Sequence, residues 1–497
     1  MTPPPIEEYK SKIKDTMILT KRGSYSSLKE AFQIYQNLSE FPPYRRFAQE
    51  NMVRIGLLLC LRESEIGILN DSYFTAVSKL IRANPHLARY LAMWKLTATS
   101  STRIRDASYF IGSSEAENFF DWLRENADAL ATELKEKAEK EEFFTYLYIH
   151  MNSEYSYSIK EEDDLTRFLN IHPDSLLIQY KLAIWPQINQ KSLETLLHEE
   201  PSFQEAHYFL GKIDLMLGRL LSAEKHFLKA FEHFPRSLSL MGSLGKVHFA
   251  LEEYGRSLEF HEKILKLTPY NRDALLGKAI CLSYLGQHEE AIKELDILRT
   301  MGTYLMGETY YWLAWNRNEL KKYKEAWKDI QNAKHYLIGH HEVHTLAGII
   351  AYELENIREA EDELKESVRL NPSECNALYY LGKIYAACSG WLKSALHFEQ
   401  AAHCFEGKEI SLTRKIREIE ASSLSQDRKK KHLKRKRVQV RKTRLLIATC
   451  FYNAAAGYFN SGKKEKAFSL AQKASSHKAL KQKADELMNR IKNQEKP

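Results

Sequence analysis

Two histidines are the first residues whose types and spacing could do chemistry. In the segment GHHEVH, from Gly339 to His344, the side chains of His340 and His344 are four residues apart and could share a helix face. Two imidazoles at this spacing can bind a metal ion, which then requires further ligands. We identify no third ligand of suitable spacing nearby. We therefore predict packed histidines here, and neither a metal nor a cofactor.

Acidic residues are the next candidates. The segment REAEDELKES, from Arg358 to Ser367, alternates carboxylates with cations at helical spacing. A pair of catalytic carboxylates would need a pocket between them, and nothing in this pattern indicates one. We predict a solvated helix face. The sequence also lacks the GxSxG, P-loop and HExxH motifs of several large enzyme classes.

A strongly basic run is the third candidate. From Arg428 to Arg444 there are eleven Lys or Arg in seventeen positions and no acid. The whole chain has a formal charge of +8, so its basic character is local. The residues that we predict to contact an anionic partner are Arg428, Lys429, Lys430, Lys431, Lys434, Arg435, Lys436 and Arg437.

Three interpretations of this run remain open. It fits a solvated helix extension, a contact with RNA, DNA or an anionic membrane surface, or a nuclear targeting signal. The run contains no aromatic residue, and aromatic residues would favour single-stranded nucleic acid.

A period of about 34 residues organises the elements that must position these candidates. Pro201, Pro235 and Pro269 are 34 residues apart, and Pro372 lies 103 residues further on, which is three more periods. Alignment on these prolines brings a large residue followed by a small one into register at Leu210-Gly211, Leu244-Gly245, Leu313-Ala314, Ala347-Gly348 and Leu381-Gly382.

Two further columns carry mostly small residues. The first contains Ala223, Ser257, Ala291, Ala326, Ala360 and Ser394, and the second contains Ala230, Ile264, Leu298, Ala333, Ser367 and Ala401. Small residues at fixed positions let two helices approach closely, and a proline ends the second helix. This pattern resembles the tetratricopeptide repeat (TPR), a helix-turn-helix unit of 34 residues.

The resemblance implies an all-α fold, a right-handed superhelical solenoid of TPR and divergent TPR-like helix-turn-helix repeats. Scarce Gly and Pro, 20 and 13 residues, agree with a helical chain. We predict five segments: a flexible N-terminal segment (1–23), a divergent helical-repeat region (24–203), six TPR repeats (204–404), a helical insertion with the basic run (405–443), and a last TPR-like repeat with a capping helix (444–497).

The basic run then has a predicted place in this array. A helix with Leu412, Ile416 and Ile419 on one stripe is expected to break around residues 422–425. Asp427 is expected to cap one long helix that leads into the last repeat. Its inward stripe would be Leu433, Val440 and Ile447.

The resemblance also implies a concave groove lined by the first helix of each repeat. The side chains expected to face it are Tyr208, Lys212, Lys246, Phe249, Tyr284, Tyr311, Trp315, Tyr352, Tyr379 and Lys383. Aromatic residues with a few amines suit an extended or helical peptide. Some of them could instead pack helix against helix.

We therefore expect a non-catalytic scaffold or adaptor that binds a segment of a protein partner in this groove. The alternative is an adaptor associated with nucleic acid or an anionic membrane through residues 428–444. Repeats and helices leave no segment of about 100 residues for a catalytic domain. We expect no small-molecule substrate and no enzyme activity.

The cysteines and the N-terminal residues indicate which cellular compartment to expect. Cys60, Cys281, Cys375, Cys388, Cys404 and Cys450 form no CxxC pair, so we expect buried thiols without disulfides. No run approaches the ~18 apolar residues of a membrane span, and MTPPPIEEYK lacks the core of a secretory signal. We expect a cytoplasmic protein, or an exported or membrane-tethered one if a signal segment was removed.

Overall fold

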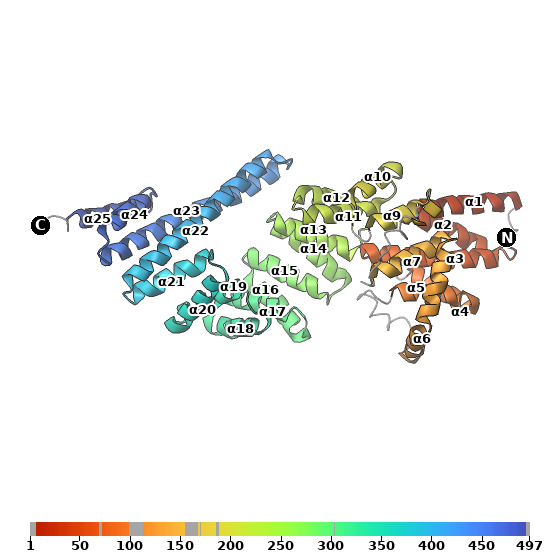
Figure 1. Ribbon diagram of the computed structural model, residues 1–497, viewed down its shortest axis with the longest axis horizontal. Coiled ribbons are helices and arrows are strands. Elements are labelled where there is room, and N and C mark those ends of the chain that lie inside the picture. Colours follow the sequence, from red (N-terminus) through yellow and green to blue (C-terminus); the bar gives the residue numbers. More distant parts are fainter. Residues whose placement is uncertain are drawn as a thin grey trace. The chain divides into compact units, whose positions relative to one another are not determined.

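The computed structural model describes residues 6–68, 72–98, 113–154, 167–168, 170–184, 188–302 and 304–493. It divides into two compact units, Met1–Leu251 and Glu252–Pro497. In both units the described chain is built of helices joined by short turns (Figure 1). The all-α prediction is confirmed. The boundary between the units falls between the two helices of the second predicted repeat, and the five sequence segments stay a prediction.

The first unit contains the divergent region and the first predicted repeats. Its helices are α1 (Ile6–Arg22), α2 (Tyr25–Ser39), α3 (Arg45–Ile66), α4 (Ser72–Ala83), η1 (Pro85–Leu87), α5 (Ala88–Ala98), α6 (Ser113–Ala138), α7 (Glu142–Glu154), α9 (Leu176–Ile184), α10 (Gln190–Glu199), α11 (Gln204–Met216), α12 (Leu220–His233) and α13 (Leu238–Ala250). Most of the segment predicted at residues 1–23 forms helix α1. Helix α1 packs against α2 and α9, and the Thr16 hydroxyl lies 2.9 Å from the Tyr35 hydroxyl in the core.

The second unit continues the array of helical hairpins. Its helices are α14 (Tyr254–Leu267), α15 (Arg272–Tyr284), α16 (His288–Met301), α17 (Met306–Glu319), α18 (Tyr323–Tyr336), α19 (His341–Glu353), α20 (Ile357–Leu370), α21 (Cys375–Ala387), α22 (Trp391–Ala421), α23 (Gln426–Asn460), α24 (Lys464–Ser475) and α25 (Lys481–Asn493). The first helices of successive hairpins, α15, α17, α19 and α21, contact one another in turn. They form one face of this unit, which we call the A-helix face.

The 34-residue period is visible in the backbone. One residue in the turn inside each hairpin adopts a left-handed conformation, with φ between 58° and 83°, at Gly218, Glu252, Gly286, Lys321, Glu355, Ser389 and Gly462. Such a residue ends the first helix and reverses the chain. Glycine adopts this conformation without a steric penalty, whereas Lys and Glu are strained there.

Close helix packing explains the small-residue columns. Ala223, Ala291, Ala326 and Ala360 have no exposed surface. A Cβ atom added at Gly382 would lie 2.8 Å from the ring of Phe398 on the paired helix, and one at Gly348 would lie 2.5 Å from Leu364 Cγ. These distances are below van der Waals contact, so the hairpins require glycine at these points.

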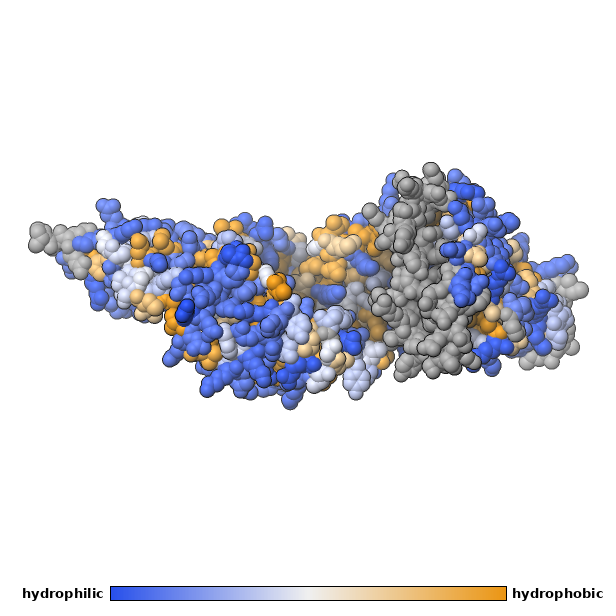
Figure 2. Space-filling view, turned by 60° about the horizontal axis from the view of Figure 1, so that its bottom comes forward, coloured by the Kyte–Doolittle hydropathy of each residue, from blue (hydrophilic) through white to orange (hydrophobic). Residues whose placement is uncertain are grey.

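The helices bury their apolar stripes and leave polar faces outside. On the face drawn in Figure 2, hydrophilic residues cover most of the described surface, with hydrophobic residues between them. At the C-terminal end, α25 buries Ala484, Leu487 and Ile491, as expected for a capping helix. None of the described helices combines the length and the apolar character needed to cross a membrane.

Helices α22 and α23 form an unusually long hairpin, which contains the predicted helical insertion at 405–443. Helix α22 has 31 residues and runs from the sixth repeat through Ala421 without a break, and α23 has 35 residues. The two pack side by side (Figure 1). The predicted break at 422–425 is confirmed, but the N-cap is Ser425 and not Asp427. We call the part formed by residues 405–444 the arm.

The cysteine prediction is wrong in two respects. Cys375 and Cys404 form a disulfide that joins α21 to α22, and Cys388 is exposed. The two cysteines are 29 residues apart in the sequence, so only the pairing of these helices brings them together. Cys281 and Cys450 are buried thiols, as expected.

The strained turn residues give a first testable prediction. Replacement of the exposed Glu355 by glycine removes a left-handed non-glycine residue, so Glu355→Gly should raise the free energy of unfolding by about 0.5–1 kcal/mol. Glu359→Gly, in the first turn of α20, is the matched control and should lower it by about 1 kcal/mol. Urea denaturation measures both. Equal losses in the two variants would contradict the assignment of the turn.

Candidate functional site

An aromatic cluster lies at the start of the second unit. Tyr254 stacks on Tyr284 with ring centroids 4.7 Å apart, and Tyr284 lies 5.8 Å from Trp312 and 6.3 Å from Trp315. Tyr311 meets Trp312 edge-on at 5.5 Å. We call these five residues the aromatic surface. Tyr284 remains 47% exposed, so the cluster is accessible from solvent.

A second group of predicted residues lies on α19 and α21. Tyr352 and Tyr380 meet edge-on at 5.4 Å, and Tyr379 contacts Tyr380 at 5.7 Å. The ammonium group of Lys383 lies 4.2 Å from the Tyr352 ring centroid and 4.6 Å from that of Tyr380. This cation–π arrangement holds the lysine against the rings.

The remaining predicted groove residues belong to the first unit. Tyr208 is largely buried, and the amine of Lys212 lies 5.5 Å from its ring centroid. Lys246 is exposed, and Phe249 is half-buried. The structure brings the predicted residues together as separate groups within each unit. It adds Tyr254, Trp312 and Tyr380, which a pattern based on repeat positions omitted.

Several of these tyrosines and two buried thiols have raised pKa values. Burial raises the pKa of Tyr254, Tyr311 and Tyr380 to about 12 in each case, so the phenols stay neutral at physiological pH. Burial also raises the pKa of the Cys281 thiol to about 11 and that of the Cys450 thiol to about 12, which makes both poor nucleophiles.

The basic run makes ionic contacts with a turn far away in the sequence. Arg428 donates from Nε and Nη2 to the two carboxylate oxygens of Glu253, at 2.8 and 2.9 Å. His432 Nε2 lies 2.9 Å from the same carboxylate, and Lys436 Nζ donates to Glu252. Because these three residues are four apart, they form one stripe of α23. We call the five-residue ion cluster the latch.

The latch changes the interpretation of the run. The side chains of His432 and Lys436 are each 7% exposed, and that of Glu253 is 10% exposed. Among the residues predicted to contact an anionic partner, Arg428 and Lys436 are therefore used inside the unit, and Arg435 donates to the backbone carbonyl of Glu252. Contacts within the folded unit thus account for part of the positive charge of the basic run.

The other cations of the run divide into two sets. Lys429 donates to the Glu420 carbonyl, and Arg437 and Arg444 form ion pairs with Glu420 and Glu409 of α22, at 3.4 and 2.6 Å. The exposed residues with no ion pair shown are Lys430, Lys431, Lys434, Arg441 and Lys442. Of the eight residues predicted to contact an anionic partner, Lys430, Lys431 and Lys434 are therefore exposed without an ion pair to the described residues of the unit, and their contact with a partner stays a prediction.

The latch gives a second prediction. In a variant with Glu252→Gln and Glu253→Gln, Arg428 and Lys436 lose their carboxylates, so the tip of the arm should open more often. We expect amide hydrogen exchange in residues 426–440 to be about thirtyfold faster, equivalent to about 2 kcal/mol.

Glu259→Gln, an exposed change on the same helix α14, is the control and should leave this exchange rate unchanged. Unchanged protection in the double variant would show that the ion cluster does not hold the tip.

The histidine and acidic candidates do not form a site. His340 is exposed and precedes α19, so it does not share a helix with His344, and the expected packed pair is wrong for His340. His344 Nδ1 lies 2.8 Å from Glu363, which also pairs with Lys334. Elsewhere on α20, Glu361 pairs with Lys365 at 2.6 Å on the outer side.

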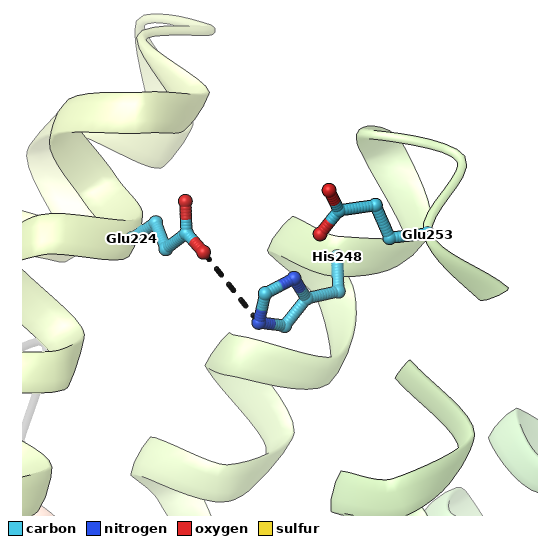
Figure 3. Close-up of side chains that lie close together, drawn as sticks. All are labelled: Glu224, His248 and Glu253. Carbon is cyan, nitrogen blue, oxygen red and sulfur yellow. Dashed lines mark ion pairs between the residues drawn. The ribbon is translucent and has the colours of Figure 1, made fainter. Parts of the chain in front are cut away.

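A second pair of a histidine and a glutamate, like His344 and Glu363, occurs in the first unit. Glu224 of α12 and His248 of α13 are both buried, with 3.8 Å between Oε1 and Nε2 (Figure 3). Glu253, also drawn there, is the latch carboxylate of the second unit.

The first unit contains a buried ionic network that no sequence pattern indicated. Arg62 of α3 donates to Glu205 of α11, and its guanidinium lies 3.4 Å from the Tyr180 ring centroid. Glu65, one turn further along α3, accepts from Lys181 of α9 at 2.7 Å. The members are distant in sequence and each looks like an ordinary surface residue of a helix.

The geometry of this network indicates a structural role. Arg62 and Glu205 are each 1% exposed, and Lys181 is 3% exposed. Burial alone would raise the pKa of Glu65, but Lys181, His150 and Arg62 outweigh it and hold this pKa well below its usual range. Charges that are enclosed and already neutralised have no path to a substrate in solvent. They connect α3 and α9 of the divergent region to each other and to the first repeat.

This network gives a third prediction. Arg62→Met leaves the Glu205 carboxylate buried without its cation and should lower the free energy of unfolding of the first unit by about 3–5 kcal/mol. The double variant Arg62→Met with Glu205→Leu should cost less than the sum of the two single changes. Chemical denaturation of all four proteins measures this coupling, and strict additivity would contradict it.

Comparisons with known proteins find partial similarities. No protein-family model matches the chain. Anaphase-promoting complex subunit 3 of Schizosaccharomyces pombe is 28% identical over 138 residues, 27% of this chain and 21% of that protein. Human trafficking protein particle complex subunit 12 is 25% identical over 95 residues, 18% of this chain and 13% of that protein. The chain thus matches about a fifth or less of these relatives.

Several solved structures are similar in part. YrrB, described as a TPR protein with an unusual peptide-binding site, is 18% identical, with 38% of this chain and 96% of that chain covered and a TM-score of 0.32. A tetratricopeptide repeat protein from Parabacteroides merdae is 16% identical, with 58% and 98% covered and a TM-score of 0.35. The hairpins and their period confirm the resemblance to TPR proteins.

Proposed function

We propose that this protein is a non-catalytic TPR scaffold that binds a segment of a protein partner on the A-helix face of its second unit. The observation that carries the proposal is the aromatic surface, in which Tyr284 remains 47% exposed beside Trp312 and Trp315. Large aromatic side chains that are already ordered offer contact area at a low entropic cost.

The ordering of these rings supports binding. Trp315 contacts His288, whose Nδ1 lies 2.9 Å from the buried Asn316. Asn316 in turn donates to Ser283 at 2.8 Å. The rings are therefore held in place before a partner arrives, which reduces the cost of association.

The relatives support a role in assembly. Both are named as subunits of multi-subunit complexes. A chain that is similar in part to such subunits is suited to hold proteins together, whereas the titratable groups described above are buried, paired or remote from one another. We therefore propose a scaffold and not an enzyme.

The test is affinity purification from the native cells with quantitative mass spectrometry. A partner recovered in stoichiometric amount with the wild type should be lost, by at least about tenfold, with the Tyr284→Ala and Trp315→Ala double variant, because hot-spot aromatics contribute about 2 kcal/mol or more each.

Tyr270→Ala is the matched control, since Tyr270 lies in the same unit, is 75% exposed and is outside the aromatic surface. It should retain the partner. Hydrogen exchange of the purified complex should protect α15 and α17. Equal recovery with the double variant, or protection elsewhere only, would contradict the proposal.

A further inference from the structure

The tip of the arm carries a surface depression that the aromatic surface does not include. It has a volume of about 830 Å³ and is lined mainly by α23, together with Glu420 at the end of α22. The cations in its lining are Lys429, Lys430, Lys434, Arg437 and Arg441, and its apolar residues are Leu433 and Val438.

These residues form one face of the helix. Lys430, Lys434, Arg437 and Arg441 follow a spacing of four, three and four residues, which is one continuous stripe about 16 Å long. Leu433 and Val438 line the same depression, and the helical rotation of 100° per residue places them at opposite edges of this stripe. This face is distinct from the latch stripe, where Arg428, His432 and Lys436 meet Glu252 and Glu253.

The depression therefore combines charge with apolar surface. Lys430, Lys434, Arg437 and Arg441 are exposed, and Val438 is 42% exposed. Two acids also line it: Glu420, which pairs with Arg437 at 3.4 Å, and Asp427. The latch fixes the helix that carries this face, so the stripe is presented in a defined orientation within the unit.

We propose that this face is a second binding site, which takes an acidic amphipathic segment of a protein partner. Carboxylates of that segment pair with Lys430, Lys434, Arg437 and Arg441, and its apolar side chains cover Leu433 and Val438. A helix laid along another helix offers both kinds of contact at the same spacing.

The lining favours this occupant over a nucleic acid. A phosphate backbone carries charge at every nucleotide and has no apolar edge, so it would leave Leu433 and Val438 uncovered. Base stacking has no aromatic partner within residues 428–444.

The lining also favours a protein segment over a membrane. An interfacial helix inserts a broad apolar face, whereas here one apolar residue lies on each side of a stripe of four cations. A protein segment places its carboxylates and apolar groups individually, so it can match a surface on which the two kinds of contact are this close together. This site does not depend on the aromatic surface, and either proposal can fail without the other.

The test uses the full chain and a fluorescein-labelled synthetic peptide of about 16 residues, with leucine at helical spacing and glutamate elsewhere. Fluorescence anisotropy should show saturable binding that weakens about thirtyfold in the variant K430Q/K434Q/R437Q/R441Q, because four charge pairs are lost. Val438→Ser should weaken it about fivefold through lost apolar burial.

Two controls separate this site from general charge attraction. The variant K463Q/K478Q/K481Q/K483Q removes the same charge from exposed residues near the C-terminal end and should bind like the wild type. A scrambled peptide of the same composition should bind at least about tenfold more weakly, because its carboxylates no longer follow the stripe.

Several outcomes would overturn the proposal. These are equal binding of the two peptides, equal losses in the two quadruple variants, or no effect of Val438→Ser. Single-stranded RNA, duplex DNA or phosphatidylserine vesicles that bind through the stripe while the peptide does not would assign the face to those ligands instead. Circular dichroism and unchanged protection of residues 426–440 establish that the variants are folded.

Discussion

The close approach of two helices within each hairpin is the constraint on which the rest of the structure depends. Gly382 faces Phe398 and Gly348 faces Leu364 at distances that leave no room for a Cβ atom. A large side chain on one helix can fill the hairpin only if its counterpart is glycine or alanine. The same requirement recurs in the long hairpin, where Gly457 lies against the backbone of Trp391 and against Ala395. The α22–α23 pair is therefore an ordinary hairpin of the array, and the arm is the part of these two helices that continues beyond this close packing.

Beyond this closely packed part, the arm depends on ions rather than on apolar packing. Arg428, His432 and Lys436 occupy one stripe, and the acidic turn at Glu252 and Glu253 lies some 175 residues earlier in the chain. The contact links the turn that precedes α14 to α23. Fully exposed ion pairs contribute little, but the side chains of these pairs are only 7–24% exposed and are therefore less screened by water and salt. The latch thus gives a definite position to a helix segment that has few apolar contacts of its own.

The periodic pattern of residue types in the sequence predicted the parts of this structure that repeat. The hairpins, the small-residue columns and the single long helix through the basic run follow from periodicity in one stretch of chain. The Cys375–Cys404 disulfide, the latch and the Arg62–Glu205 pair do not, because each joins residues from different elements. In a single sequence, Arg62 and Glu205 have the appearance of exposed helix residues, and only tertiary packing makes them core. For the same reason, repeat positions found Tyr284 and Trp315 but missed Tyr254 and Trp312, which complete the aromatic surface from neighbouring positions.

The aromatic surface and the arm adjoin at one turn, and this has a physical consequence. Burial is the main reason that the pKa of Tyr254 is raised to about 12; Glu252 raises it further, whereas Arg435 lowers it. The ring that ends the aromatic surface therefore lies within the electrostatic field of the latch. A partner that displaced Tyr254 or approached Glu252 would change the surroundings of Lys436 as well. Conversely, the latch cations neutralise the carboxylates of Glu252 and Glu253 beside the rings. An acidic segment therefore meets less repulsion at that end of the aromatic surface than these two carboxylates alone would produce. The ion cluster thus both positions the arm and sets the charge at the edge of the aromatic surface.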